Sequence, residues 1–141
     1  MLKGNEQQFY LQLGRYGCYF LCLVHIAEKY TDSSIDVYNA AMIAKDNGAI
    51  LLSLDFDDAD DFFINDPEKI LALLTGTRPK VRHSSSKEAA VQCAEKEKGF
   101  VITKYIRGNV THFDMETFHP LYSSYTKKYG EIEGYRLVQF D

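Results

Sequence analysis

The sequence lacks tryptophan, has three prolines and three cysteines in 141 residues, and contains no long hydrophobic run. Three cysteines are too few, and odd in number, for a disulfide-stabilised scaffold, so we expect reduced thiols. The longest apolar run, residues 19–24, is far too short to cross a bilayer, and the first residues show no apolar segment typical of a secretory signal. We therefore expect a cytoplasmic protein that has no membrane partner.

A cluster of basic residues is also lacking. The lysines and arginines are scattered along the chain, and the net charge is −4. Because a nucleic-acid interface needs clustered cations to displace counterions from phosphates, the sequence predicts no nucleic-acid partner. The ten tyrosines and nine phenylalanines are numerous, and they are compatible with a homodimer surface as well as with an aromatic-rich core.

The chain shows no repeat, low-complexity tract or linker, and its length suffices for one sizeable core. A single domain over residues 1–141 is therefore expected. The hydrophobic periodicity predicts helices at 18–30, 35–46, 67–75 and 85–98, and strands at 80–82, 100–106, 110–115, 117–121 and 135–140. Helices followed by strands indicate an α+β fold whose antiparallel sheet comes mostly from the C-terminal half.

Capping residues set the expected starts of three helices. Asp66 followed by Pro67 is typical of a helix N-terminus. Ser85 with Glu88 forms a capping-box pattern, and the polar residues 31–34 can cap the second helix.

Cys18 stands at the start of the first predicted helix, one residue after Gly17 and six after Gln12. A thiol at a helix N-terminus faces unpaired backbone N–H groups and the positive end of the dipole, which stabilise a thiolate. A carboxamide just upstream can donate a hydrogen bond to a developing oxyanion. The arrangement suggests a nucleophile at Cys18 and an oxyanion donor at Gln12. An isolated cysteine in an apolar helix is otherwise a small buried hydrophobe, which is our interpretation of Cys22 and Cys93.

Among the four histidines, His112 is the best candidate for a general base, because it lies in a predicted strand that can pack against the helix of the nucleophile. His25 lies seven residues along that same helix, a rise of roughly 10 Å, and is interpreted as a polar surface or core residue. His83 is interpreted as a solvated residue of a loop. If residues 115–116 form a two-residue turn, His119 lies opposite His112 and can hold its tautomer.

Two segments carry a resemblance to a known superfamily: Tyr16-Gly-Cys-Tyr-Phe-Leu21, and Thr111-His-Phe113 through Pro120-Leu121. With a glutamine six residues before the cysteine, they resemble the papain-like cysteine peptidases, above all the small bacterial and phage branches that include the bacteriocin-leader peptidases. More narrowly, they look like an uncharacterised family from spirochaetes and phages. The resemblance implies a papain-like fold, with a central N-terminal helix packed on a C-terminal antiparallel sheet. It also implies a Cys–His acyl-transfer hydrolase with a peptide or amide substrate.

Carried over residue by residue, the resemblance makes Cys18 the nucleophile, His112 the general base and Gln12 the oxyanion donor. The orienting third residue of the superfamily is normally an aspartate just before a proline, a place that His119 occupies here. A histidine in this role occurs in the related cell-wall amidase branch. Asp114, two residues after His112 on the same strand face, is a substitute orienter.

Two alternatives stay open. A zinc site formed by the pair Cys18 and Cys22 with His112 and His119 is one, although this spacing is uncommon for structural zinc, and the prediction is no metal and no cofactor. The other is a catalytically silent protein of the same fold with a binding or assembly role, such as one derived from a phage.

Overall fold

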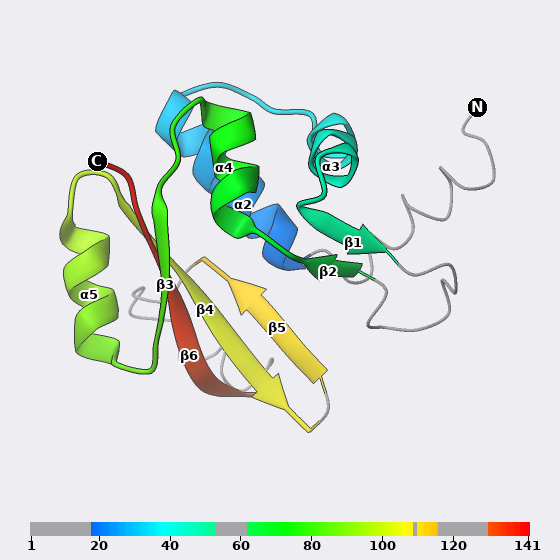
Figure 1. The fold of residues 1–141 in the computed structure, drawn as a ribbon. Coiled ribbons are helices and arrows are strands. Elements are labelled where there is room, and N and C mark those ends of the chain that lie inside the picture. Colours follow the sequence, from blue (N-terminus) through cyan, green and yellow to red (C-terminus); the bar gives the residue numbers. More distant parts are fainter. Residues whose placement is uncertain (1–17, 53–61, 109, 116–129) are drawn as a thin grey trace. The chain divides into compact units, whose positions relative to one another are not determined.

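The computed structural model describes residues 18–52, 62–108, 110–115 and 130–141 (Figure 1). The chain divides into two compact units, residues 1–77 and 78–141, and each is described by itself. None of the helices within the described ranges is long and apolar enough to cross a membrane.

The first unit contains three described helices, α2 (Cys18–Thr31), α3 (Val37–Asp46) and α4 (Pro67–Thr75), and two short strands, β1 (Ile50–Leu52) and β2 (Phe62–Ile64). The strands pair antiparallel, with Ile50 opposite Ile64. Helix α2 packs against α3 and α4. One side of α2 is exposed, at Leu21, His25 and Lys29. Its buried residues are Phe20, Cys22, Leu23, Val24, Ile26 and Ala27.

Helices α3 and α4 each begin directly after an aspartate whose side chain caps the helix N-terminus. Asp66 accepts a hydrogen bond from the Lys69 N–H at 2.9 Å, Pro67 is the first residue of α4, and Gly76 ends it in a left-handed conformation, as predicted. The start predicted for the second helix is wrong by two residues. Asp36, rather than residues 31–34, caps α3 by accepting from the Asn39 N–H at 2.8 Å.

The second unit is a four-stranded antiparallel sheet with the order β3-β6-β4-β5. Its strands are β3 (Lys80–Ser84), β4 (Gly99–Arg107), β5 (Val110–Asp114) and β6 (Glu131–Gln139). A mixed α+β class with a sheet from the C-terminal half is therefore confirmed. The predicted strand 117–121 lies outside the described residues, and the single-domain and papain-like assignments stay predictions.

Helix α5 (Lys87–Glu95) packs on β4 and β6. The buried cluster between this helix and the sheet consists of Ala90, Cys93, Val101, Tyr135 and Leu137. The cap of α5 is Ser86, whose hydroxyl accepts from the Ala89 N–H at 3.1 Å, and not the predicted Ser85. The helix ends three residues before the predicted 98, since the chain must turn into β4 at Gly99, where a Cβ atom would collide with the Cys93 carbonyl oxygen.

Candidate functional site

Cys18 is the first described residue of α2, and its side chain is half-buried. The first described turn of α2 carries no acidic residue. The first backbone N–H groups of a helix have no partner within the helix, and they favour an anion beside them. Cys18 is a partly accessible free thiol, and its place at a helix N-terminus and its role as a nucleophile stay predictions. Gln12, the predicted oxyanion donor, lies outside the described residues.

The other two cysteines are buried, as expected of small hydrophobes. Cys22 lies one turn further along α2 and is 7% exposed, and Cys93 of α5 is 2% exposed. The Cys93 sulfur lies 3.7 Å from the carbonyl oxygens of both Phe100 and Val138. Burial raises the pKa of the Cys93 thiol, so this residue is a poor nucleophile. None of the three cysteines forms a disulfide.

His112, the predicted general base, lies in the middle of β5 with a half-buried ring. Its Nε2 atom is 3.9 Å from Oδ2 of Asp114, an ion-pair distance when the imidazole is protonated. The side chains of residues 112 and 114 share one face because side chains alternate along a strand. The carboxylate that the sequence offered as a substitute orienter is thus observed beside the imidazole. His119, the first candidate for that role, lies outside the described residues.

Neighbouring residues of β4 complete the surroundings of this pair. Tyr105 is the register partner of His112, and the two ring centroids are 6.5 Å apart with the planes tilted by 34°. Thr103 is the register partner of Asp114. Thr103 is fully buried, and its hydroxyl oxygen has no hydrogen-bond partner among the described residues.

The predicted nucleophile and the predicted base belong to different units of the chain. Cys18 is part of residues 1–77 and His112 is part of residues 78–141, so their meeting stays a prediction. What the described residues bring together is the dyad of His112 and Asp114, both on one strand.

His83 was predicted to lie in a loop, and this is wrong. It is the fourth residue of β3 and pairs with Arg136 of β6, because the strand continues to Ser84 rather than ending at Arg82. Partial desolvation lowers the pKa of His83, and the positive charges of Arg136 and Lys104 lower it further. His83 is therefore a neutral imidazole beside cations.

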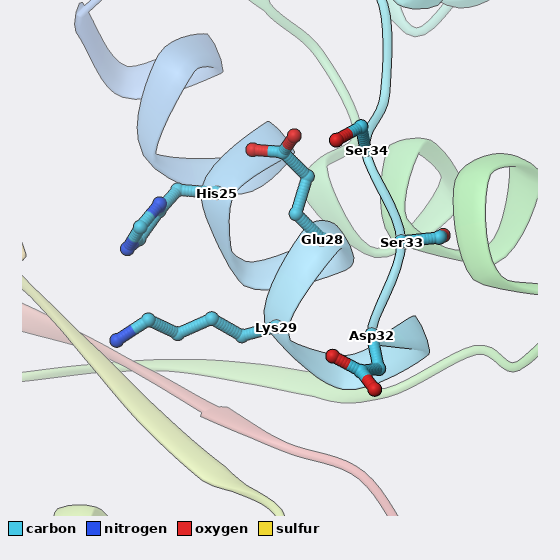
Figure 2. A pocket seen from close by; sticks show the side chains of 6 residues that line it. All are labelled: His25, Glu28, Lys29, Asp32, Ser33 and Ser34. Atoms are coloured by element: carbon cyan, nitrogen blue, oxygen red, sulfur yellow. The ribbon is translucent and has the colours of Figure 1, made fainter.

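His25 is exposed on α2 and borders an open hollow of about 390 Å³ at the C-terminal end of that helix (Figure 2). Figure 2 shows that His25 and Lys29 extend on one side of the helix while Ser33 points away from them. Glu28 accepts a hydrogen bond from the Ile35 N–H at 3.0 Å, so its carboxylate binds the backbone of the segment that follows α2. The side chains of the hollow do not converge on a common point, and it is a weaker candidate site than the β5 dyad.

In the part of the chain that the structure describes, no group of three or more His, Cys, Asp or Glu side chains is arranged to hold a metal ion. The alternative zinc site includes His119, which lies outside that part. Thr103 and Tyr105, which lie opposite Asp114 and His112, were not predicted from the sequence to be near this pair. The signal that could have found them is Arg107-Gly108-Asn109-Val110, because a two-residue turn there puts residue 112 opposite 105.

The fold and the dyad define a mixed α+β protein with a carboxylate–imidazole pair on a sheet strand. The chain belongs to the family described as "Protein of unknown function, DUF261", whose model matches residues 1–137. The matched range contains all four predicted site residues, Gln12, Cys18, His112 and His119. A search of curated proteins and a search of solved structures found no match. The family description names no activity, so function is argued from the residues.

Proposed function

We propose that this protein is a thiol hydrolase with a papain-like fold, a peptidase or amidase in which Cys18 is the nucleophile and His112 the general base. The observation that carries the proposal is the accessibility of Cys18, a half-buried free thiol at the first described residue of α2. The carboxylate beside His112 supports the second half of the proposal, because a general base needs a group that orients its ring.

The proposed reaction is acyl transfer through the sulfur. The Cys18 thiol proton moves to His112, and the sulfur forms a bond to the substrate carbonyl carbon. The oxyanion accepts hydrogen bonds from the Gln12 amide and the Cys18 backbone N–H. The C–N bond then breaks as His112 gives the proton to the leaving amine. A water molecule, deprotonated by His112, hydrolyses the thioester and restores the thiol.

The order of elements and the state of the cysteines agree with this proposal. The helix that begins with the nucleophile precedes an antiparallel sheet whose strand β5 carries the base, as in the superfamily that the sequence resembles. The absence of disulfides among the three cysteines suits a reducing compartment, so the proposal includes a cytoplasmic location.

Alkylation of the three cysteines by iodoacetamide tests the proposal, with each peptide followed separately by mass spectrometry. We expect Cys18 to react faster than Cys22 and Cys93, and to keep reacting below about pH 7 because a base and a helix N-terminus favour its thiolate. In His112→Ala the reactivity below about pH 7 is expected to fall about tenfold or more.

Two controls belong to this experiment. Cys22→Ser removes the neighbouring thiol and is expected to leave the rate at Cys18 unchanged. Cys93, which is 2% exposed, is the internal standard for a buried thiol. If Cys18 instead shows an ordinary profile rising near about pH 8.5 in both the wild type and His112→Ala, the hydrolase proposal fails. The silent protein with a binding or assembly role then replaces it.

A further inference from the structure

Three basic side chains that are far apart in the sequence meet on one face of the C-terminal sheet. They are His83 of β3, Lys104 of β4 and Arg136 of β6, all within residues 78–141. We infer that these three residues, the basic cluster, bind a phosphate group, either as inorganic phosphate or as part of a phosphomonoester. The cluster shares no residue with the proposed hydrolase, so this inference goes beyond the proposed function.

The register of the sheet places the three residues together. His83 lies directly opposite Arg136 in the β3–β6 ladder, and Lys104 lies diagonal to Arg136, two residues beyond its β4 partner Ile102. Residues that are opposite each other, or two places further along, share one face of a sheet because side chains alternate. Leu137, the next residue after Arg136, belongs to the cluster under α5. The basic cluster therefore lies on the face that α5 does not cover.

The guanidinium of Arg136 extends across this face toward β5. Its Cζ atom lies 5.7 Å from the centroid of the Phe113 ring, and Phe113 is the register partner of Lys104. Arg136 is half-buried, and its Nε atom is buried without a hydrogen-bond partner among the described residues. A guanidinium that is already stacked on a ring loses less conformational freedom when it binds an anion. Arg136 is thus preorganised as an anion ligand.

The positive charges of the basic cluster are only partly balanced. Nζ of Lys104 lies 3.2 Å from Oε1 of Glu133, so this lysine has a counterion. Within the described ranges no carboxylate lies at ion-pair distance from Arg136. His83 is exposed, and its pKa is lowered by partial desolvation and then by the charges of the other two residues. Like charges gathered on one face oppose each other, and an anion among them removes this cost.

A phosphate group matches these donors in number and in charge. Its terminal oxygens can accept hydrogen bonds from the fork of Arg136, from the ammonium of Lys104 and from a ring N–H of His83. Near neutral pH it carries close to two negative charges. Because Glu133 balances Lys104, the two charges correspond to Arg136 and a protonated His83. Phosphate binding is therefore expected to raise the pKa of His83, since an anion favours the imidazolium.

NMR of the full-length protein with ¹⁵N-labelled histidine measures this binding through the ring signals of His83, which His83→Gln identifies. Inorganic phosphate is titrated at about pH 7.5, where it is mainly a dianion, with sodium chloride keeping the ionic strength constant. We expect a saturable shift with half-saturation at about 1–10 mM. Acetate has a single charge, and we expect it to bind about fivefold or more weakly than phosphate.

Substitutions of Arg136 test its part in the site. Arg136→Gln is expected to weaken phosphate binding about tenfold or more, because a charged fork of donors is lost. Arg136→Lys keeps the charge but not the fork, and we expect it to weaken binding about three- to tenfold. Arg82→Gln is the matched control, because Arg82 precedes His83 on β3 and lies opposite Leu137, on the other face. It is expected to change the half-saturation by less than about twofold.

The His83 signal also defines the results that would overturn the inference. A shift that does not saturate, or that chloride alone produces, would do so, as would equal binding of acetate. A loss in Arg82→Gln as large as that in Arg136→Gln would show an unspecific charge effect. Should Arg136→Gln fail to fold, Arg136→Lys decides, and a change of less than about 1.5-fold in it would contradict the site.

Methyl phosphate distinguishes the two sources of the phosphate group. Binding of methyl phosphate as tight as that of inorganic phosphate would support a phosphomonoester as the ligand. Binding of inorganic phosphate alone would support the free ion. Failure of both to produce a saturable shift at His83 would refute the site.

Discussion

The two ends of one sheet face differ in what they bury. At the α5 end, Val101 of β4 and Leu137 of β6 are nearly inaccessible and pack with the apolar side of the helix. At the β5 end of the same face, Thr103 is followed by Tyr105, and the dyad of His112 and Asp114 faces them. One end follows the rule that apolar residues fill a core, while the other contains the buried hydroxyl of Thr103, which has no hydrogen-bond partner among the described residues.

The buried and the accessible thiol show the same contrast. Cys93 lies in the α5 cluster, and its environment opposes the thiolate by burial. Cys18 is the first described residue of α2 and is half-buried. The two cysteines thus differ in burial, and the packed Cys93 is the standard against which the reactivity of the accessible Cys18 is judged.

The largest effect is expected at the α5 end. Leu137→Ala removes a side chain that is 1% exposed, and we expect it to lower the free energy of unfolding by about 2–5 kcal/mol through lost burial and a residual cavity. Urea denaturation measures this. Ile106→Ala, at an exposed position of β4, is the control, with an expected change within about 0.5 kcal/mol. A loss below about 1 kcal/mol in Leu137→Ala would show that this end is not the core.

At the β5 end we expect a substitution that raises the free energy of unfolding instead of lowering it. Thr103→Val replaces a buried hydroxyl that has no partner among the described residues with a methyl group of similar shape. We expect the free energy of unfolding to rise by about 1 kcal/mol, since an unsatisfied polar group is removed. Thr111→Val, on the exposed part of β5, is the control and is expected to change little. A clear loss of stability in Thr103→Val would mean that the hydroxyl has a partner after all.

A smaller change in the free energy of unfolding is expected when the pH is lowered, because of the titration of His83. Its pKa is lowered in the folded protein, so the unfolded chain binds the proton more readily. The stability that depends on neutral His83 is present above the ordinary value of 6.5 and is lost as the pH falls through the lowered pKa. The ring is largely exposed, so we expect a loss below about 1 kcal/mol. Denaturation of the wild type and His83→Gln on both sides of this range measures it, and an equal loss in both would contradict the account.

Elements with strong local signals could be predicted from the sequence. Helix α4 has its cap, its proline and its terminal glycine where the pattern predicts them, and β4 differs from the predicted strand by one residue at each end. The start of α3 and the strand position of His83 were predicted wrongly. Asp36 competed with earlier polar residues as a cap, and β3 is extended by pairing with a strand some fifty residues later in the chain.

The candidate site could be predicted in part. The proximity of His112 to Asp114 follows from local spacing along one strand, whereas the position of Cys18 at a helix start stays a prediction. The contacts of this dyad with β4 depend on the register of the β4–β5 hairpin, which pairs Arg107 with Val110 around Gly108. The buried hydroxyl of Thr103 could not be predicted, because its burial depends on packing between elements distant in the chain.

The central proposal is that His112 and Asp114 of β5 act on the thiol of Cys18, and a double-mutant cycle on Cys18 alkylation tests it most directly. The rate below about pH 7 is measured in the wild type, His112→Ala, Asp114→Ala and the double variant. The account predicts that both single variants are slower than the wild type and that adding Asp114→Ala to His112→Ala has no further effect. Equal rates in all four proteins would contradict it.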